Sequence, residues 1–355
     1  MDKIIKVGLI GFGVGGQIFH APVLTTVEGL ELTKIRASKP EQVAAAKAKY
    51  PNAEIVNTSE EIFNDENIDL IVITTPNIFH YPLVQQALLA DKHVVVDKPF
   101  TINTQEADEL IALAEKQNRV LCVYHNRRFD SDFYTIQKII KEGLLGDIVE
   151  MESRFDRFRN FLKPGAWREE DAPGTGILYD LGSHLIDQVQ ALFGLPQAIT
   201  ADLRIQRKGG KANDNFEVIL HYPFIKASVK SGMLVREPLP RLILLGSNGS
   251  FVKYGMDVQE EDLKAGLTSL TKTNWGIEPA NRWGTINTEL NGQHFIGKIE
   301  SEKGDYAGVY RNVYNTILGK ENLIVTPLQA RNNIRIIELA MQSQREKRTV
   351  DFSFS

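Results

Sequence analysis

The sequence predicts an α/β protein of two domains: a doubly wound parallel-sheet domain over residues 1–124, then an α+β domain over 125–355 with a large open-faced, mostly antiparallel sheet. Three observations predict this. A length of 355 residues exceeds one ordinary hydrophobic core. Short apolar runs alternate with helical segments up to residue 124, which is typical of a parallel sheet covered on both faces. Beyond residue 198, strands follow one another with short turns, as in an antiparallel sheet.

The composition excludes several classes of function. The net charge is -4 and no long block of like charge occurs, so we expect neither a nucleic-acid partner nor a membrane surface. The single cysteine, Cys122, lies in an apolar run and has no partner for an internal disulfide, so we expect a cytoplasmic location. A strand begins within a few residues of Met1, and no apolar run approaches the ~20 residues of a spanning helix. We therefore expect neither a secretory signal nor a membrane segment.

Strands and helices alternate through the first domain. The first strand runs into Gly11, and a helix follows to about Val27. The further predicted strands are 32–37, 54–56, 70–74, 93–96 and 120–124. The further predicted helices are 41–49, 59–63, 80–90 and 104–117.

The pattern changes in the second domain. Its predicted helices are 132–142, 177–193, 306–318 and 328–342. Its predicted strands are 148–157, 198–206, 216–222, 227–234, 241–245 and 250–254, and residues 255–300 show no clear pattern. No helical run between residues 198 and 254 covers the sheet, whose free face we expect to be apolar. We therefore expect a homodimer or homotetramer joined through these sheets.

The pattern Gly11-x-Gly13-x-x-Gly16 follows the first strand and opens a helix. In a Rossmann domain, Gly11 makes the tight turn, Gly13 lets the backbone approach a pyrophosphate, and Gly16 lets the helix pack closely. The alternative is a glycine-rich loop without a ligand. Its place at the start of a βαβ series favours dinucleotide binding.

The turn after the second strand indicates which dinucleotide is preferred. An NAD site usually carries an acidic residue ~20 positions past the glycine loop, but here the chain reads Arg36-Ala-Ser38-Lys39. Ser38 can donate to a 2′-phosphate and Lys39 can pair with it, although the segment can also be a plain turn before Pro40. We therefore expect NADP, with NAD as the weaker alternative.

Two further motifs carry groups able to move a proton. Asp97-Lys98-Pro99 follows the fifth strand, at the sheet edge where open α/β folds bind ligands. In the 177–193 helix, Asp180 lies four residues before His184, so its carboxylate can orient the imidazole of a general acid/base. A surface Asp–His pair without function fits the spacing equally well.

In this order, the glycine loop, Asp97-Lys98-Pro99 and Asp180-x-Gly182-x-His184 resemble the Gfo/Idh/MocA family of NAD(P)-dependent sugar and polyol oxidoreductases. The resemblance covers almost the whole chain and includes Thr74-Thr-Pro-Asn77 with His80, and His125-Asn-Arg-Arg-Phe-Asp130. One departure is Asp97, where the family usually has Glu, so the carboxylate is kept on a shorter stem.

The resemblance implies that substrate binds between the domains over the nicotinamide. His184 would act as base on an alcohol, Asp180 would orient it, and Lys98 would hydrogen-bond the reacting oxygen; Tyr179 and Asp187 are the next candidates for the base. Together with the glycine loop and the turn after the second strand, the resemblance assigns these residues to the cofactor: Gly11, Phe12, Gly13, Gly16, Ser38, Lys39, Thr75, Pro76, Asn77, His80, Asp97, Lys98, Asn126, Trp167 and Arg168. It assigns these to the substrate: Lys98, Asn126, Arg127, Asp156, Tyr179, Asp180 and His184. We expect no metal, because the seven histidines lack ligand-like spacing.

Within the family, Trp167-Arg168 and residues 178–184 are most similar to NADP-dependent scyllo-inositol dehydrogenases of bacilli. This resemblance implies reversible oxidation of scyllo-inositol to scyllo-inosose. The alternatives are another sugar (an aldose, a keto-sugar or an anhydro-sugar) and, in a different class, a dinucleotide-sensing regulator without catalysis. Arg127 and Arg154 leave a sugar acid or a sugar phosphate open, although local carboxylates or the cofactor phosphate can pair with either arginine. The presence of Lys98, Asp180 and His184 together favours an enzyme.

Overall fold

The computed structural model describes residues 3–354, and the chain divides into two compact units. The first unit contains the chain up to Asn126 together with Gln259–Trp275 and Asp305–Arg331, and the second contains the remainder. The sequence assigns everything beyond residue 124 to a second domain, whereas 259–275 and 305–331 group with the first unit. Helical periodicity shows that a helix has an apolar face, but not which partner covers it.

The first unit is built on a six-stranded sheet in which all neighbouring strands are parallel. Its strands are β1 (Ile5–Ile10), β2 (Leu30–Arg36), β3 (Glu54–Val56), β4 (Leu70–Ile73), β5 (His93–Val96) and β6 (Leu121–Val123). The strand order is β3-β2-β1-β4-β5-β6, so the direction of winding reverses between β1 and β4. Open α/β sheets bind ligands at the carboxyl ends of the strands beside such a reversal.

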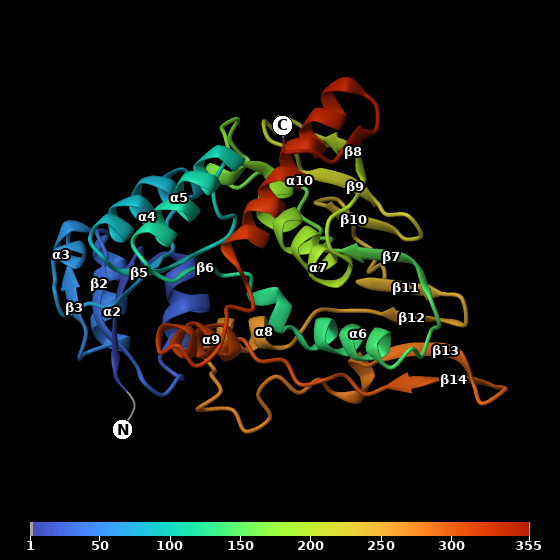
Figure 1. Cartoon of the computed structure of the whole chain (residues 1–355), viewed down its shortest axis with the longest axis horizontal. Helices are drawn as coiled ribbons and strands as arrows, with labels where there is room; N and C mark the ends of the chain where they lie inside the picture. Colours follow the sequence, from blue (N-terminus) through green and yellow to red (C-terminus); the bar gives the residue numbers. More distant parts are fainter. Residues whose placement is uncertain (1–2, 355) are drawn as a thin grey trace. The chain divides into compact units, whose positions relative to one another are not determined.

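Helices on this sheet come from both early and late segments of the chain. They are η1 (Gly15–His20, a π-helix), α1 (Ala21–Leu24), α2 (Pro40–Lys49), α3 (Glu60–Phe63), α4 (His80–Leu89), α5 (Thr104–Lys116), α8 (Gln259–Lys264) and α9 (Ala307–Ile317). Figure 1 shows α4 and α5 side by side. The late helices contact the early ones: α9 packs on α1, and α8 packs on η1.

The second unit is built on a nine-stranded sheet of order β14-β13-β12-β11-β7-β10-β9-β8-β15. Its strands are β7 (Ile148–Arg154), β8 (Ala198–Arg204), β9 (Asn215–His221), β10 (Lys226–Gly232), β11 (Leu242–Gly246), β12 (Gly249–Lys253), β13 (Gly284–Leu290), β14 (Gln293–Ile299) and β15 (Val350–Asp351). The β7–β10 pair is parallel and the other neighbouring pairs are antiparallel. The mostly antiparallel sheet expected from the sequence is therefore confirmed.

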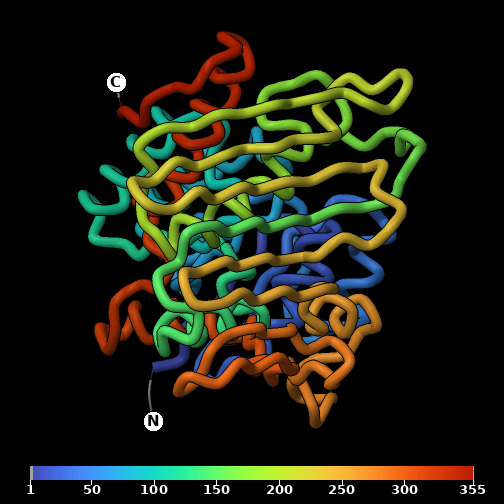
Figure 2. Tube along the Cα trace, turned by 90° about the vertical axis from the view of Figure 1, so that its right-hand side faces the viewer, coloured from blue at the N-terminus to red at the C-terminus, as the bar shows by residue number. Residues whose placement is uncertain are grey.

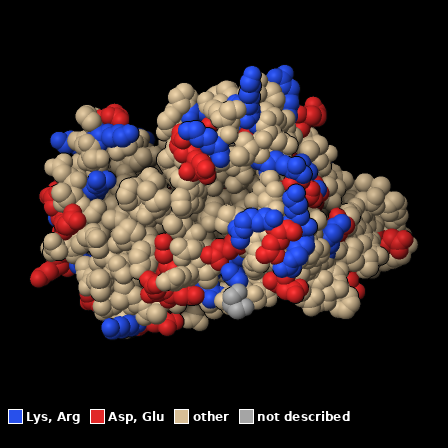
Figure 3. Space-filling view, turned by 90° about the horizontal axis from the view of Figure 1, so that it is seen from above, with Lys and Arg blue, Asp and Glu red and all other residues tan. Residues whose placement is uncertain are grey.

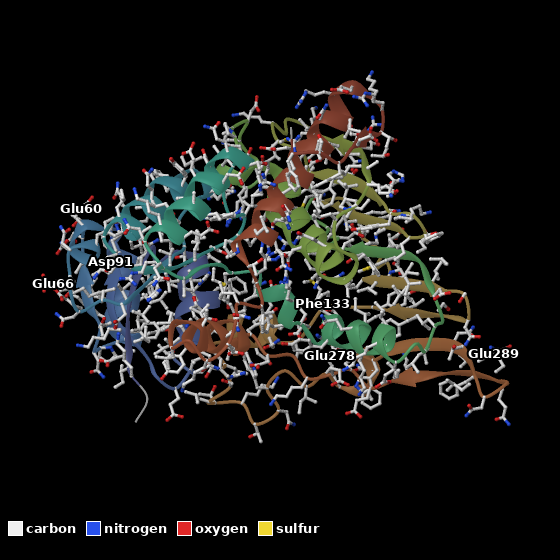
Figure 4. All side chains as sticks on the ribbon, viewed as in Figure 1. Glu60, Glu66, Asp91, Phe133, Glu278 and Glu289 are labelled. Atoms are coloured by element: carbon white, nitrogen blue, oxygen red, sulfur yellow. The ribbon has the colours of Figure 1, made fainter. Side chains whose placement is uncertain are left out.

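One face of this sheet is covered by α6 (Ser131–Lys141), α7 (Ser183–Phe193) and most of α10 (Pro327–Glu346). The core between them is apolar and includes Phe133 of α6, labelled in Figure 4, with Leu185 of α7 and Met151 of β7.

The other face of the sheet, seen in Figure 2, has no helix of this unit in front of its strands. This face is mixed in polarity, so the prediction of an apolar free face is wrong. Lys230 Nζ on β10 lies 2.7 Å from a Glu152 oxygen and 3.1 Å from a Glu217 oxygen. Period-two alternation places such charged residues outward on the same strands that place apolar residues in the core.

The charge distribution agrees with the nearly neutral composition. On the face in Figure 3, Lys and Arg side chains are interspersed with Asp and Glu. Among residues 3–354, no helix combines the length and apolarity needed to cross a bilayer.

Candidate active site

The geometry of the glycine loop agrees with the role predicted for each of its three glycines. Gly11 has φ +99°, a conformation that favours glycine, and so it makes the turn after β1. A Cβ added at Gly16 would lie 2.4 Å from the Gly11 carbonyl oxygen, so only glycine permits this approach. At Gly13 an added Cβ would meet no atom within 4 Å. The loop is therefore closed on one side and open at the position where a pyrophosphate would approach.

The end of β4 fixes the loop to the sheet. Thr74 Oγ1 donates to the Gly11 carbonyl oxygen at 2.5 Å, and the Thr74 N–H donates to the Ile10 carbonyl at 2.9 Å. Phe12 is buried, and its carbonyl accepts a hydrogen bond from Gln17 Nε2. The side-chain hydroxyl of Thr75 is buried without a hydrogen-bond partner in residues 3–354. An open loop beside an unsatisfied donor fits a phosphate-containing cofactor.

Asp97 lies beside this loop and is held as a carboxylate. Its Oδ2 atom lies 3.2 Å from where a Cβ at Gly15 would stand, and its Oδ1 accepts the Lys98 N–H at 2.8 Å. Burial acts to raise the pKa of Asp97, but the contact with His20 and the charges of His20, Lys98 and His80 lower that pKa to about 2. The Lys98–Pro99 peptide bond is cis.

Two buried histidines contact the loops at this edge of the sheet. His20 Nε2 lies 3.7 Å from Asp97 Oδ1, while its Nδ1 lies 2.6 Å from the hydroxyl of Tyr310 on α9. His80, predicted to bind cofactor, is fully buried, with ring nitrogens 2.9 Å from the Thr75 carbonyl and 2.8 Å from the Pro99 carbonyl. The structure therefore places His80 as a link between the loops after β4 and β5. Asn77 and Asn126 are also buried, and Pro76 and Lys98 are half-buried.

The turn after β2 presents two exposed polar residues at the start of α2. Ser38 and Lys39 are exposed, Lys39 is the N-cap, and Pro40 begins the helix. Arg36 ends β2, and its Nε is buried without a hydrogen-bond partner in the described chain. A helix N-terminus beside cationic side chains suits an anion.

In the second unit, the helix that carries Asp180 and His184 begins irregularly. Residues Leu178–Gly182 form a π-helical turn, closed by the Ser183 N–H on the Leu178 carbonyl, before α7 begins. The sequence predicts one continuous α-helix here. The extra residue in a π-turn changes the angle between side chains four apart, and such turns are frequent at functional sites. Arg168 Nε lies 3.3 Å from Asp180 Oδ1 and its guanidinium stacks on Trp167 at 4.4 Å.

An aromatic ring that the sequence analysis missed connects His184 to two buried arginines. The imidazole of His184 meets the Phe155 ring at 6.2 Å between centroids and 67° between planes. The guanidinium of Arg127 lies 5.4 Å from that ring and that of Arg241 lies 4.1 Å from it. Arg127 was predicted from the motif after the sixth strand, whereas Phe155 and Arg241 have no local signal.

Both arginines have nearby carboxylates of their own. Arg127 Nη1 lies 3.5 Å from Asp130 Oδ2, and Arg241 Nε lies 3.5 Å from Asp132 Oδ2. All four side chains are at least nine-tenths buried. Their charges therefore balance within the protein.

Two of the predicted residues are placed away from this group. Asp187, a reserve candidate for the base, is fully buried and receives two hydrogen bonds from Arg128 at 2.7 and 2.6 Å, so it is held as the partner of a cation. Asp156 accepts from Arg154 Nε at 2.7 Å, and Arg154 also pairs with Glu152 on the open face of the sheet. The structure therefore groups Asp156 with the open face and not with Phe155 and His184. Tyr179, the other reserve candidate, is buried in the core.

Comparisons with known proteins divide the chain near residue 125, and the second family model includes the late segments 259–275 and 305–331 that group with the first unit. Residues 5–125 match the family model described as "Oxidoreductase family, NAD-binding Rossmann fold", and residues 137–352 match "Oxidoreductase family, C-terminal alpha/beta domain". The chain is 42% identical to the uncharacterized oxidoreductase YdgJ of Escherichia coli over 99% of both chains. It is 40% identical to scyllo-inositol 2-dehydrogenase (NADP(+)) IolW of Bacillus subtilis, over 98% of this chain and 95% of that one.

A solved structure extends the similarity to the fold. The oxidoreductase yvaA of Bacillus subtilis superposes with a TM-score of 0.94 at 39% identity, covering 99% of each chain. Two family models that together span most of the chain, and relatives of this identity and coverage, establish the relationship. The chain belongs to the Gfo/Idh/MocA family of oxidoreductases, with an NAD-binding Rossmann fold in its first unit.

Proposed function

We propose that this protein transfers hydride between NADP and a hydroxyl-bearing carbon of a neutral cyclic polyol, with scyllo-inositol and scyllo-inosose as the preferred pair. The printed name of the Bacillus subtilis relative supports this choice of substrate and cofactor. The structural observation that carries it is the balance of charge around His184.

A substrate with a carboxylate or phosphate needs an unpaired cation in its pocket. From the sequence, Arg127 was a candidate to bind a carboxylate or phosphate of the substrate. In the structure it lies beside Asp130. Arg154 lies on the open face of the sheet, away from His184, and pairs with Glu152 and Asp156. With both arginines balanced, a neutral ligand that offers hydroxyl groups is the better match than a sugar acid or a sugar phosphate.

In the proposed reaction the alcohol loses a hydride from carbon and a proton from its hydroxyl group. This is a two-electron oxidation, and a ketone remains. The bound nicotinamide supplies the hydride chemistry. His184 takes the hydroxyl proton, and the Asp180 carboxylate favours the imidazolium that results. Lys98 donates to the reacting oxygen and stabilises its developing negative charge. In the reverse direction His184 returns the proton.

The preference for NADP rests on the turn after β2. The residue pair that follows the strand is Ser38 and Lys39, both exposed, and no acidic residue is available there to accept from a ribose 2′-hydroxyl. A charge-assisted hydrogen bond to a 2′-phosphate contributes roughly 1.5–3 kcal/mol. We expect kcat/KM with NADP to exceed that with NAD by about ten- to a hundredfold.

The test is the initial rate with each inositol isomer, D-glucose, D-xylose and 1,5-anhydrofructose, at saturating NADP(H) and at saturating NAD(H). We expect scyllo-inositol to give the highest kcat/KM, because an epimer leaves a buried hydrogen-bonding group unpaired, at ~1–3 kcal/mol per contact. A higher kcat/KM with an aldose or the anhydro-sugar would contradict the inositol assignment. Binding of NADP without turnover of any compound would favour a sensing role.

We also propose assembly into a homodimer or homotetramer through the open face of the nine-stranded sheet. Ile243 and Val252 lie half-buried on adjacent strands of this face, next to the Glu152–Lys230 pair, so the surface offers both apolar area and charge. Light scattering at micromolar concentration should give the mass of two or four chains, and a monomeric mass would contradict the proposal.

A further inference from the structure

A buried arginine far from any recognised motif holds the segment that carries Trp167 and Arg168. Arg207 lies in the connection between β8 and β9, and its side chain is only 4% exposed. Its Nε donates to Asp214 Oδ2 at 2.8 Å, within the same connection. Its Nη1 reaches across to the other segment, donating to the Phe161 carbonyl at 2.8 Å and lying 3.3 Å from Glu169 Oε1.

The segment that Arg207 reaches is otherwise poorly buried. Phe161, Lys163, Pro164 and Arg168 are exposed, and residues 159–171 contain a single helical turn, Trp167–Glu169. The side chain of Glu169 is 15% exposed and lies between Arg207 and the Lys163 N–H. A loop of this kind keeps one conformation only if a few strong contacts fix it.

The same connection fixes the far end of the segment. The Asn213 carbonyl accepts the Ile177 N–H, and its side-chain oxygen accepts the Leu178 N–H at 2.9 Å, just where the π-helical turn begins. The chain between these two anchors carries Arg168, and Arg168 contacts Asp180. A path of charged contacts therefore runs from Asp214 through Arg207 to Glu169, one residue from Arg168.

We propose that Arg207 is a positioning residue: by holding Glu169 it fixes the Trp167–Glu169 turn and so sets Arg168 against the Asp180 carboxylate. This inference rests on the proposed function, in which Asp180 orients His184. Lysine cannot replace arginine here, because one ammonium group cannot contact Asp214 and Glu169 with the fork geometry of a guanidinium.

The first test does not depend on catalysis. Trypsin needs a locally extended chain, so the rate of cleavage after Arg159 and Arg168 measures how readily the segment opens. In Arg207→Ala we expect cleavage there at least tenfold faster than in the unmodified protein, with a smaller increase in Arg207→Lys. The matched control is Lys211→Ala, which removes the exposed Lys211–Glu170 pair between the same two segments and should leave the cleavage rate unchanged. Equal cleavage rates in the unmodified protein and Arg207→Ala would overturn the proposal.

The second test asks whether Arg207 acts through Arg168. If it does, Arg207→Ala and Arg168→Ala should each lower kcat/KM by about tenfold, and the double variant should be no worse than either one. Additive losses would overturn the proposal. Glu169→Gln, which keeps the Arg207–Asp214 pair, serves if Arg207→Ala fails to fold, and it should reproduce both the faster cleavage and the lower kcat/KM. An unmodified protein that turns over no polyol contradicts the proposed function alone, since the proteolysis comparison still decides the role of Arg207.

Discussion

In the glycine loop, alanine substitution should have little effect on stability at Gly13 and a large effect at Gly16. At Gly13 the φ angle lies outside the left-handed region and an added Cβ meets nothing within 4 Å. At Gly16 the added Cβ lies 2.4 Å from a backbone oxygen, about 1 Å inside ordinary contact. Gly13→Ala should therefore leave the free energy of unfolding within about 0.5 kcal/mol of the original value. Gly16→Ala should lower it by about 1–3 kcal/mol, since the backbone must move.

Gly13→Ala should instead weaken cofactor binding. A methyl group at Gly13 occupies the open side of the loop and removes one backbone contact with the pyrophosphate, which is worth roughly 1.5–3 kcal/mol. We expect the Kd for NADPH to rise by about ten- to a hundredfold, measured by nucleotide fluorescence, with urea unfolding of the same samples as the stability readout. An unchanged Kd in Gly13→Ala would refute the assignment of the loop, and a strongly destabilised Gly13→Ala would refute the geometry.

Three further predictions follow from the same structure. Lys98→Ala and His184→Ala should each lower kcat by about 10²–10⁴-fold with a nearly unchanged Kd for NADPH; an active His184→Ala would place the base elsewhere. Asp187→Ala should lower the free energy of unfolding by ~3–5 kcal/mol, because the buried Arg128 guanidinium loses the carboxylate that balances its charge, and near-normal stability in urea would contradict this. Burial lowers the pKa of His93 to about 4, and a ring nitrogen accepts a backbone hydrogen bond. Since the unfolded chain binds that proton near pH 6.5, the free energy of unfolding should fall between pH 6.5 and 4, by at most ~3 kcal/mol, and His93→Gln should flatten this fall.

The first unit was most predictable where its strands are buried on both faces. β4 is buried at every position and reads as an unbroken apolar run, and its predicted range, 70–74, differs from Leu70–Ile73 by one residue. The hairpin of β13 and β14 could not be predicted for the opposite reason. Phe295 and Ile296 on β14 are 43% and 60% exposed, so no alternation of buried and exposed residues marks the strand.

The candidate site was predictable only where motifs are local. Lys98, Asp180 and His184 stand in short patterns, whereas Phe155 and Arg241 join the site through contacts between distant segments. The π-turn before α7 was invisible as well, because its apolar spacing is that of an ordinary helix. A Cβ at Gly182 would lie 3.3 Å from the Phe216 ring, so the turn packs closely against β9, a contact that local spacing does not reveal.

The assembly of the first unit from three stretches of chain constrains how the protein is made. His20 is among the earliest residues to leave the ribosome, yet its hydroxyl partner, Tyr310, is translated 290 residues later. Until then the nascent sheet lacks α8 and α9, and the surfaces of η1 and α1 that these helices contact remain open to solvent. Native contacts between such distant residues form slowly and leave apolar surface exposed meanwhile. A fragment ending at Asn126 should therefore aggregate more readily than the complete chain, although it contains every strand of its sheet.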